Sequence, residues 1–285
     1  MDAIAIRIFT DSTCDLSIED QARLNIHVVP LTVHFSEESY LDGLEITNEQ
    51  FYDKLDNSAA LPTTSQVTPQ AFIDAFKEYL DAGDEIVGIF ISSEISGTYH
   101  SACIAKETLT VGHLYIVDSR SATMSLALLL SEAAKCRDAG CSAEYIAEHV
   151  TMLSQKVRFL AAVNTLKYLR KGGRVSATTA VIGEFLGMKP IVSMIDGKVT
   201  SVGKARGMPE ALKAILQKTL TDVPDSRYGA AFAHSCAPEL VEQAVSCMRE
   251  PLKLVDWLTC SISSVIGTYA GRGAVGFAYI ARTSG

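Results

Sequence analysis

Apolar and polar positions alternate along the first half of the chain in a pattern typical of an α/β fold. Apolar runs that predict strands cover Ala3–Phe9, His27–Phe35, Glu85–Ile91 and Leu114–Val117. Between them, apolar residues recur at the spacing of one helix face. That spacing predicts helices over Ser17–Leu24, Asn48–Leu55, Pro69–Ala82, Gly97–Leu109, Ser125–Ala139 and Ala143–Gln155. Strands that alternate with helices in this way indicate a mostly parallel sheet.

The second half of the chain has a more mixed pattern. Predicted strands cover Phe159–Val163, Tyr228–His234, Leu252–Trp257 and Gly276–Ala281. Predicted helices cover Thr178–Phe185, Pro209–Leu220 and Pro238–Met248. Asp196-Gly197 lies between two further strand-like runs, Pro190–Ile195 and Lys198–Val202, and this dipeptide is a strong hairpin signal.

The change of pattern near Gln155 predicts two domains, residues 1–155 and residues 156–285. We expect an α/β chain with a mostly parallel sheet in the first domain and a mixed sheet in the second. No low-complexity linker marks the boundary, and the chain has no internal repeat.

Composition and charge exclude several classes of protein. The chain has 285 residues, of which 48% are hydrophobic and 20% charged, so it is long enough for a sizeable core and unlike a disordered chain. Its net charge of -8 and the lack of a long basic block argue against nucleic-acid binding. No signal peptide and no run of about 20 apolar residues is present, so we expect a cytoplasmic protein without a transmembrane segment.

The cysteines and histidines do not form a metal motif. There are seven cysteines and six histidines, with no C-x-x-C pair and no ligand spacing. We therefore expect reduced cysteines, no metal and no cofactor.

Three predicted strands of the first half end in small polar residues, in the stretches FTDST, FISSEIS and VDSRS. In an open parallel sheet, ligands bind beyond the carboxyl ends of the strands. Three such ends therefore indicate a binding crevice. The alternative for each one is simple helix capping, since Ser, Thr and Asp are also the preferred N-cap residues; Asp15 or Ser17 suits the helix that begins near Ser17.

The stretch ISGTYHSA indicates an anion cradle rather than a nucleophile. Gly97 allows close backbone approach, and Ser96, Thr98 and the first N–H groups of the following helix can donate to a carboxylate or phosphate. The stretch is not a G-x-S-x-G elbow. His100 lies on the outgoing helix, where a solvated side chain is expected, so no general base accompanies Ser96.

Two further stretches contain polar clusters that can be explained either by binding or by a purely structural role. In LPTTSQVTP, Thr68 and Pro69 suit the start of a helix, which leaves Thr64-Ser65 without a structural role. In LKYLRKGGRVS, the basic residues and the double glycine suit a helix C-terminus. The basic residues can also receive an acidic partner or a phosphorylated ligand at the rim of a crevice.

Taken in order, these stretches resemble a known family. TDST, TSQ, SGTYxSA, VDS, LxYLxKGGRVS, GMKPI and a glycine-rich C-terminal stretch follow one another from about Ile6 to Ala281. Each is weak alone, but together they resemble the DegV family of bacterial fatty-acid-binding proteins. The resemblance implies two α/β domains that hold one long-chain fatty acid in a tunnel between them.

By the same resemblance, the fatty-acid carboxylate meets Thr64 and Ser96, with Ser65, Gly97 and Thr98 next to them. The family has a histidine in a T-H-x-G-P-G stretch near the C-terminus. The matching stretch here is TYAGRG, in which Tyr269 replaces that histidine and Arg272 replaces the proline.

This departure changes the chemistry that the carboxylate meets. A tyrosine hydroxyl still donates one hydrogen bond to a carboxylate, but it does not change charge near neutral pH as imidazole does.

The resemblance also implies a carrier without chemistry of its own. It presents the carboxylate to a fatty acid kinase, which makes an acyl phosphate for phospholipid synthesis, with transient membrane contact. Arg170 and Arg174 match basic positions of the family and are expected to face the kinase, as is Arg206. Candidates for the tunnel wall, each of which also suits an ordinary core, are Leu160, Val163, Leu166, Ile182, Phe185, Leu186 and Met188.

Two other functions compete with the carrier. One is a phosphatase or acyl hydrolase that uses Asp11 or Ser96; Asp11 follows the first strand, but Thr13 stands where a phosphotransfer enzyme has its general acid. The other is a regulatory protein that uses a bound lipid as a signal, which the sequence does not separate from the carrier.

Overall fold

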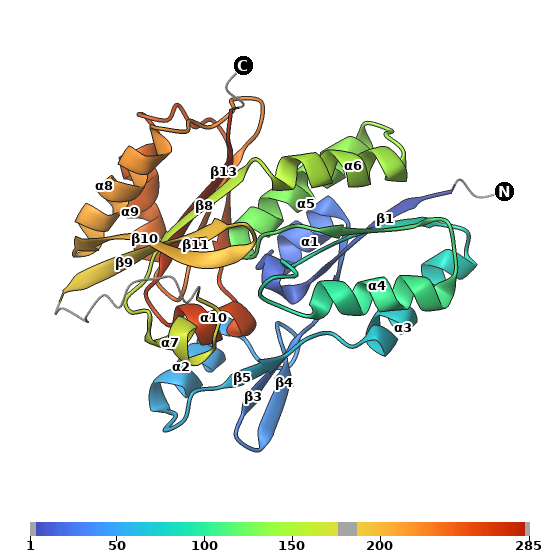
Figure 1. Ribbon diagram of the computed structural model, residues 1–285, viewed down its shortest axis with the longest axis horizontal. Helices are drawn as coiled ribbons and strands as arrows, with labels where there is room; N and C mark the ends of the chain where they lie inside the picture. The colour runs from blue at the N-terminus through green and yellow to red at the C-terminus, as the bar shows by residue number, and fades with distance from the viewer. Residues whose placement is uncertain (1–3, 176–186, 283–285) are drawn as a thin grey trace.

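The fold is α/β and contains two large β-sheets that lie side by side (Figure 1). The computed structural model describes residues 4–175 and 187–282. The first sheet is fully parallel, in the order β2-β1-β6-β7. Its strands are β1 (Ile6–Asp11), β2 (Ile26–Val29), β6 (Glu85–Phe90) and β7 (Leu114–Asp118). The predicted parallel sheet of the first half is confirmed.

The second large sheet is mixed, as predicted, and has the order β10-β9-β8-β13-β11-β12. Only β11 and β12 pair in parallel; the other neighbours are antiparallel. The strands are β8 (Val157–Ala162), β9 (Met188–Ile195), β10 (Lys198–Arg206), β11 (Ala230–His234), β12 (Trp257–Ser261) and β13 (Val275–Ile280). The hairpin around Asp196-Gly197 is confirmed, whereas the domain boundary at Gln155 stays a prediction.

A small antiparallel sheet, in the order β4-β3-β5, lies below the large sheets in the view of Figure 1. Its strands are β3 (Thr32–Phe35), β4 (Glu38–Leu41) and β5 (Thr63–Ser65). The single strand predicted over His27–Phe35 is therefore wrong: Pro30 cannot donate to a ladder, so the run breaks there and continues in another sheet.

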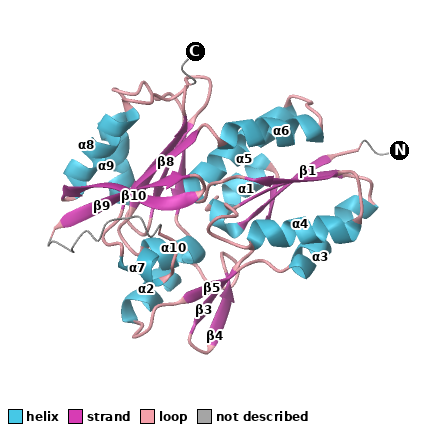
Figure 2. Cartoon of the chain, viewed as in Figure 1, coloured by secondary structure: helices cyan, strands magenta, loops and turns pink. Residues whose placement is uncertain are grey.

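Helices surround the sheets (Figure 2). They are α1 (Ile18–Leu24), α2 (Asn48–Asn57), α3 (Pro69–Asp81), α4 (Thr98–Leu109), α5 (Thr123–Asp138), α6 (Ala143–Ser154), α7 (Lys167–Lys171), α8 (Met208–Thr219), α9 (Pro238–Met248) and α10 (Ser264–Ala270), with a 3₁₀ turn η1 (Ser12–Cys14). Ser17 caps α1, and Thr68 caps α3 with Pro69 in its first turn, as the sequence predicts. The helix predicted over Thr178–Phe185 lies outside the described residues.

Two elements of the C-terminal region differ from the prediction. The strand expected over Leu252–Trp257 is wrong, because that segment forms a turn and the strand begins at Trp257. The short helix α10 is not predicted, since its seven residues span only two turns and include Gly267.

Helix α5 joins the two large sheets into one core. It packs against β1 and β6 of the first sheet and against β11, β12 and β13 of the second. Every residue from Thr123 to Ala134 is buried. A helix that is covered all round is expected to be largely apolar, and Leu126–Leu130 meets that requirement, while the buried Glu132 is paired with Lys135.

Two buried carboxylates hold the start of α10 against the first half of the chain. Asp15 accepts a hydrogen bond from the backbone N–H of Ser263 at 3.0 Å. Asp42 accepts from the Ser263 hydroxyl and from the N–H of Ser264, both at 3.0 Å. These carboxylates give acceptors to N–H groups that would otherwise be unpaired at the helix start.

Burial makes the charged forms of these two carboxylates unfavourable. It raises the pKa of Asp15 from 3.8 to about 7, against the nearby Thr123 hydroxyl and the hydrogen bond from Ser263, which lower it. Burial also raises the pKa of Asp42, although its hydrogen bonds to Ser264, Ser12 and Ser263 oppose the shift. The folded protein therefore binds a proton at Asp15 more tightly than the unfolded chain does.

This shift predicts a pH dependence of stability. The contribution of Asp15 is fully present below about pH 4 and is lost as the pH rises to about 7, because the native pKa is the higher one. In Asp15→Asn, whose amide oxygen can still accept from Ser263, the contribution disappears. As the pH rises from 4 to 7, we expect the unfolding free energy of the wild type to fall relative to that of Asp15→Asn. Urea denaturation of both proteins at each pH measures this difference.

The exposed carboxylate of Asp138 provides the control, since Asp138→Asn should follow the wild type over the same range. Curves for wild type and Asp15→Asn that stay parallel would show that Asp15 does not titrate in this window.

Candidate functional site

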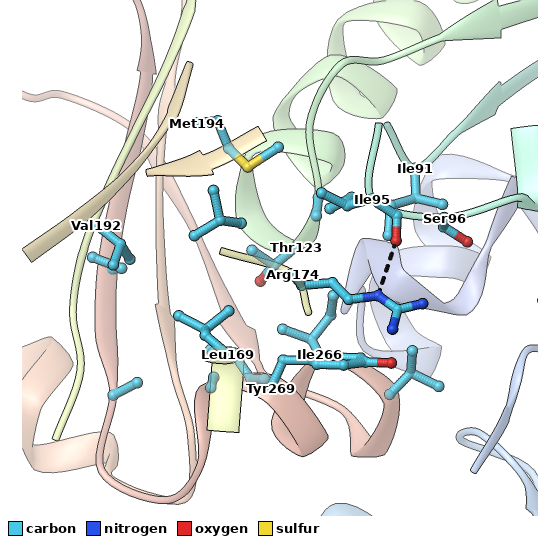
Figure 3. Close-up of a pocket in the computed structure, with 18 of the residues that line it drawn as sticks. Ile91, Ile95, Ser96, Thr123, Leu169, Arg174, Val192, Met194, Ile266 and Tyr269 are labelled. Carbon is cyan, nitrogen blue, oxygen red and sulfur yellow. Dashed lines mark hydrogen bonds between the residues drawn. The ribbon is translucent and has the colours of Figure 1, made fainter. Parts of the chain in front are cut away.

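A cavity of about 360 Å³ is lined by residues of both halves of the chain (Figure 3). Its walls come from β5 and the residue after it, the loop after β6, the start of α5, strands β8, β9, β10 and β13, and α10. Most of the lining is apolar, and the polar groups converge from a few segments. Cavities of this size and character are the usual sites of small-molecule binding.

The apolar wall follows from the alternation of side chains along a strand. Phe159 and Ala161 of β8, and Val163 just after it, face the cavity, whereas Leu160 packs on the opposite face of the sheet with Ile191. The prediction of a wall residue is therefore wrong for Leu160.

The other predicted wall residues have different outcomes. Val163 lines the cavity, while Leu166 packs with Leu169 in the core behind it, and Met188 lies outside the lining. The remaining candidates, Ile182, Phe185 and Leu186, lie outside the described residues.

Two hydroxyls that are far apart in sequence meet at the cavity. Thr64 comes from β5 and Tyr269 from α10, and their oxygens are 2.6 Å apart. Ser65 also lines the cavity, and its Oγ lies 2.7 Å from Nε2 of His34 on the neighbouring strand β3. The small sheet thus brings Thr64-Ser65 to the site, which explains the part of LPTTSQVTP that helix capping leaves unexplained.

The loop after β6 brings Ser96 and Gly97 to the same cavity. The Ser96 hydroxyl donates to Oγ1 of Thr98 at 3.0 Å and accepts from the Thr98 N–H at 3.2 Å. Thr98 itself is fully buried and is not part of the cavity lining. The structure therefore places Thr98 behind Ser96, where it orients the serine, and not beside it.

Gly97 is required by the close approach of Gln66. A Cβ atom at position 97 would lie 1.9 Å from Oε1 of Gln66. Gln66 lines the cavity and donates from Nε2 to the Ser101 hydroxyl at 2.9 Å. Gln66 belongs to the TSQ stretch, yet the sequence does not single it out, since only the fold brings β5 next to the start of α4.

Thr123 is a second lining residue that the sequence analysis missed. It begins α5 with φ of 51°, a left-handed conformation that β-branched residues rarely adopt. Its hydroxyl is buried and has no hydrogen-bond partner at bonding geometry, although Thr123 is close enough to Asp15 to lower the pKa of that carboxyl. The stretch VDSRS ends two residues before it and is the only sequence signal nearby.

The three predicted basic residues occupy different places. Arg174 lines the mouth of the cavity, with its guanidinium 5.1 Å from the ring centre of Tyr269. Its Nε donates to the carbonyl of Ile95 at 3.4 Å, the dashed line in Figure 3. Arg170 on α7 and Arg206 at the end of β10 are exposed and do not line the cavity.

The contacts of Asp11 do not suit a nucleophile. Asp11 is fully buried; Oδ1 accepts from the Thr13 N–H at 3.0 Å and Oδ2 from the Ile91 N–H at 2.8 Å. Burial raises its pKa to about 6 against these hydrogen bonds. Asp11 is not part of the cavity lining, so its carboxylate fixes the loop after β6 instead.

Neither a metal centre nor a membrane span is evident in the described parts of the chain. Within residues 4–175 and 187–282, His, Cys, Asp and Glu do not gather in groups of three that could bind a metal ion. In the same residues, no helix combines the length and apolar character that crossing a bilayer requires.

The fold and the cavity define an α/β protein with two large sheets, a small third sheet and a mostly apolar pocket. A family model described as "Uncharacterised protein, DegV family" matches residues 5–282. A DegV domain-containing protein of Clostridium perfringens is 37% identical over 213 residues, which cover 75% of this chain and 76% of the relative. One from Clostridium acetobutylicum is 34% identical over 282 residues and covers 97% of this chain and 98% of its own. The chain belongs to the DegV family.

Solved structures support the same assignment. A fatty-acid-binding DegV family protein from Thermus thermophilus has a TM-score of 0.86 at 30% identity, covering 97% of this chain and 100% of its own. DegV from Bacillus subtilis, described as a fatty acid binding protein, has a TM-score of 0.84 at 27% identity, covering 98% of this chain and 100% of its own.

The contact between Gly97 and Gln66 gives a test that needs no ligand. Gly97→Ala should lower the unfolding free energy by about 1–3 kcal/mol, because the new methyl group displaces the Gln66 amide. Gly97 has φ of -76°, so the backbone itself accepts alanine. Chemical denaturation of Gly97→Ala, Gln66→Ala and the double variant measures the coupling.

The double variant should be nearly as stable as Gln66→Ala alone, since the clash is then absent. Additive losses in the double variant would contradict the contact.

Proposed function

We propose that the protein binds one long-chain fatty acid, with the acyl chain in the cavity and the carboxylate at the polar cluster of Thr64, Ser65, Ser96, Gly97 and Tyr269. The observation that carries the proposal is one cavity whose lining is apolar along β8 and β9 and also includes these five residues, of which Thr64 and Tyr269 are in contact. An amphipathic ligand with one polar end matches that division. Fatty-acid binding by the Thermus thermophilus and Bacillus subtilis relatives supports it.

The physical roles of the two ends differ. Burying an acyl chain contributes about 0.8 kcal/mol per CH₂ group, so the tail supplies most of the affinity. A carboxylate left unpaired in a low dielectric would oppose binding, and the hydroxyls of Thr64, Ser96 and Tyr269 can donate to it. Neutral donors orient the carboxylate without the strong attraction of a close ion pair.

Arg174 adds a positive charge at the mouth of the cavity. Its guanidinium lies over the ring of Tyr269, and Arg174 is exposed to solvent while it also lines the cavity. A carboxylate that enters or leaves the cavity meets this charge. Arg170 and Arg206 are exposed and lie outside the cavity lining.

The protein acts in this proposal as a carrier that hands its acid to a fatty acid kinase for acyl phosphate formation, with transient membrane contact during exchange. Arg170, Arg174 and Arg206 form the surface that docks the kinase. Two features favour a carrier over a hydrolase: the Ser96 hydroxyl is bonded to Thr98 and not to a general base, and the Asp11 oxygens are occupied by Thr13 and Ile91.

Mass spectrometry tests the ligand directly. Protein purified from a bacterial host and then denatured should release a long-chain fatty acid in about equimolar amount, because the buried tail dissociates slowly. Delipidated protein should take up added acid. Protein that neither carries nor takes up a fatty acid would rule out the proposal.

Substitution tests the carboxylate site. The double variant Thr64→Ala/Ser96→Ala should bind a fatty acid at least about tenfold more weakly, since two donors to a charged group are lost. Titration calorimetry measures this effect. Thr108→Ala is the matched control, because the Thr108 hydroxyl bonds only to the Ile104 carbonyl on the exposed face of α4. Equal affinities for the double variant and the control would place the carboxylate elsewhere.

A further inference from the structure

The tip of the β9–β10 hairpin has little strand support from its own sheet; on its outer side, one isolated bridge joins Val199 of β10 to Val175. β10 is an edge strand, and β9 pairs with β8 only through Ile191, Val192 and Ser193. The pairs Met194 with Val199 and Ile195 with Lys198 have no further strand beside them on the β8 side. An isolated two-stranded hairpin is marginally stable, so the tip needs other contacts to stay in place.

This hairpin tip is also a wall of the cavity. Met194 of β9 and Val199 of β10 both line it, one step beyond the lining residue Val192 (Figure 3). A displacement of the tip would therefore open the apolar part of the cavity. The floor formed by β8 and β13 would be unaffected, since those strands pair along their whole length.

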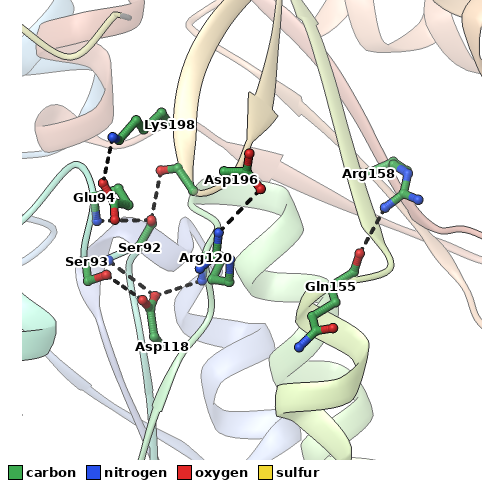
Figure 4. A network of polar contacts seen from close by, with 10 residues as sticks. Ser92, Ser93, Glu94, Asp118, Arg120, Gln155, Arg158, Asp196 and Lys198 are labelled. Atoms are coloured by element: carbon green, nitrogen blue, oxygen red, sulfur yellow. Dashed lines mark hydrogen bonds and ion pairs between the residues drawn. The ribbon is translucent and has the colours of Figure 1, made fainter.

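Three polar contacts hold the tip to the first half of the chain (Figure 4). The Ser92 hydroxyl donates to the Gly197 carbonyl at 2.8 Å. Lys198 pairs with Glu94 at 3.1 Å, and Arg120 with Asp196 at 3.7 Å. The two ion pairs are exposed and contribute little, whereas Ser92 is fully buried and its hydrogen bond is protected from water.

Ser92 also sets the position of the loop that carries Ser96. Its carbonyl accepts from the Ser96 N–H at 3.2 Å, and its own N–H donates to the Ser121 carbonyl at 2.9 Å. One buried residue therefore touches the hairpin turn, the start of the Ser96 loop and the segment before α5. The wall of the cavity and the polar cluster therefore share one anchoring residue.

The turn at the tip is shaped for this contact. Gly197 has φ of 77°, and a Cβ there would lie 2.6 Å from the Ser92 hydroxyl oxygen. Glycine is thus required both by the left-handed backbone and by the approach of Ser92. A β-bulge between Ser201 and Gly203 interrupts the ladder farther down β10 and provides a point where the hairpin can bend.

We propose that the β9–β10 hairpin tip is the moving wall through which the acyl chain enters and leaves, and that Ser92 is the positioning residue that holds it closed. The proposal rests on the proposed function and adds a route and a residue to it. Release of the tip from Ser92 exposes the apolar cavity beside Met194. The backbone carbonyl of Ser92 is not part of the bond to Gly197, so its hydrogen bond from the Ser96 N–H stays in place as the wall opens.

The first test measures release of the fluorescent long-chain acid cis-parinaric acid from delipidated, reloaded protein into excess lipid vesicles. Ser92→Ala should release the acid about tenfold faster, the change expected when one buried hydrogen bond of about 1.4 kcal/mol is lost. Lys198→Ala, which removes only an exposed ion pair, should stay within about twofold of the wild type. An unchanged release rate in a folded Ser92→Ala protein would overturn the inference.

A second test fixes the tip without altering any buried group. A carbodiimide joins the Lys198 amine to the Glu94 carboxylate as an amide, since these atoms are already 3.1 Å apart. Peptide mass mapping confirms the bond, and the protein is then loaded with the same acid after the reagent is removed. Loading and release should both slow at least about tenfold relative to Lys198→Ala treated identically, which carries every other cross-link.

The outcomes separate this inference from the function on which it rests. Equal rates in the cross-linked wild type and the treated Lys198→Ala would show that the acid uses another route, and would overturn the inference alone. Failure of untreated wild type to bind cis-parinaric acid or any other long-chain acid would overturn the proposed function and the inference with it.

Discussion

The hydrogen bonds from the start of α10 to the buried carboxylates of Asp15 and Asp42 are the interaction on which the site depends. They hold α10 at one place, and α10 carries Tyr269. Tyr269 in turn meets Thr64 and supports the guanidinium of Arg174. These two carboxylates, whose burial is itself unfavourable, thus determine where the mouth of the cavity lies. Because one partner comes from the beginning of the chain and the other from its end, this tie forms only when both halves are folded.

A second tie at Ser92 has a different character. The α10 tie involves several charged or partly charged groups in the interior, whereas the hairpin tip is held to the first half of the chain by one buried neutral hydrogen bond and two exposed ion pairs. The interior tie keeps the polar cluster together, and the weaker tie at Ser92 lets one wall move. A pocket that must both retain and release an apolar ligand needs this difference in strength between its two sides.

Much of the fold follows from local pattern. The parallel strands of the first half, the capped helices and the hairpin at Asp196-Gly197 agree with the structure because each depends on period, capping or turn chemistry within a few residues. The elements that the pattern predicts wrongly or misses also have identifiable physical causes. Pro30 divides one apolar run between two sheets, and α10 depends on tertiary hydrogen bonds that no local pattern reports.

The sequence by itself determined the fold class and the stretches in which the site's hydroxyls lie, since periodicity and residue type are local properties. Only the tertiary structure decided which of those side chains face the cavity. Ser96 faces it while Thr98 lies behind, Arg174 reaches the mouth while Arg170 and Arg206 do not, and Gln66 joins the lining through Gly97. These choices depend on the direction of each side chain and on contacts between segments more than a hundred residues apart, such as Thr64 with Tyr269, and no local pattern encodes either of them.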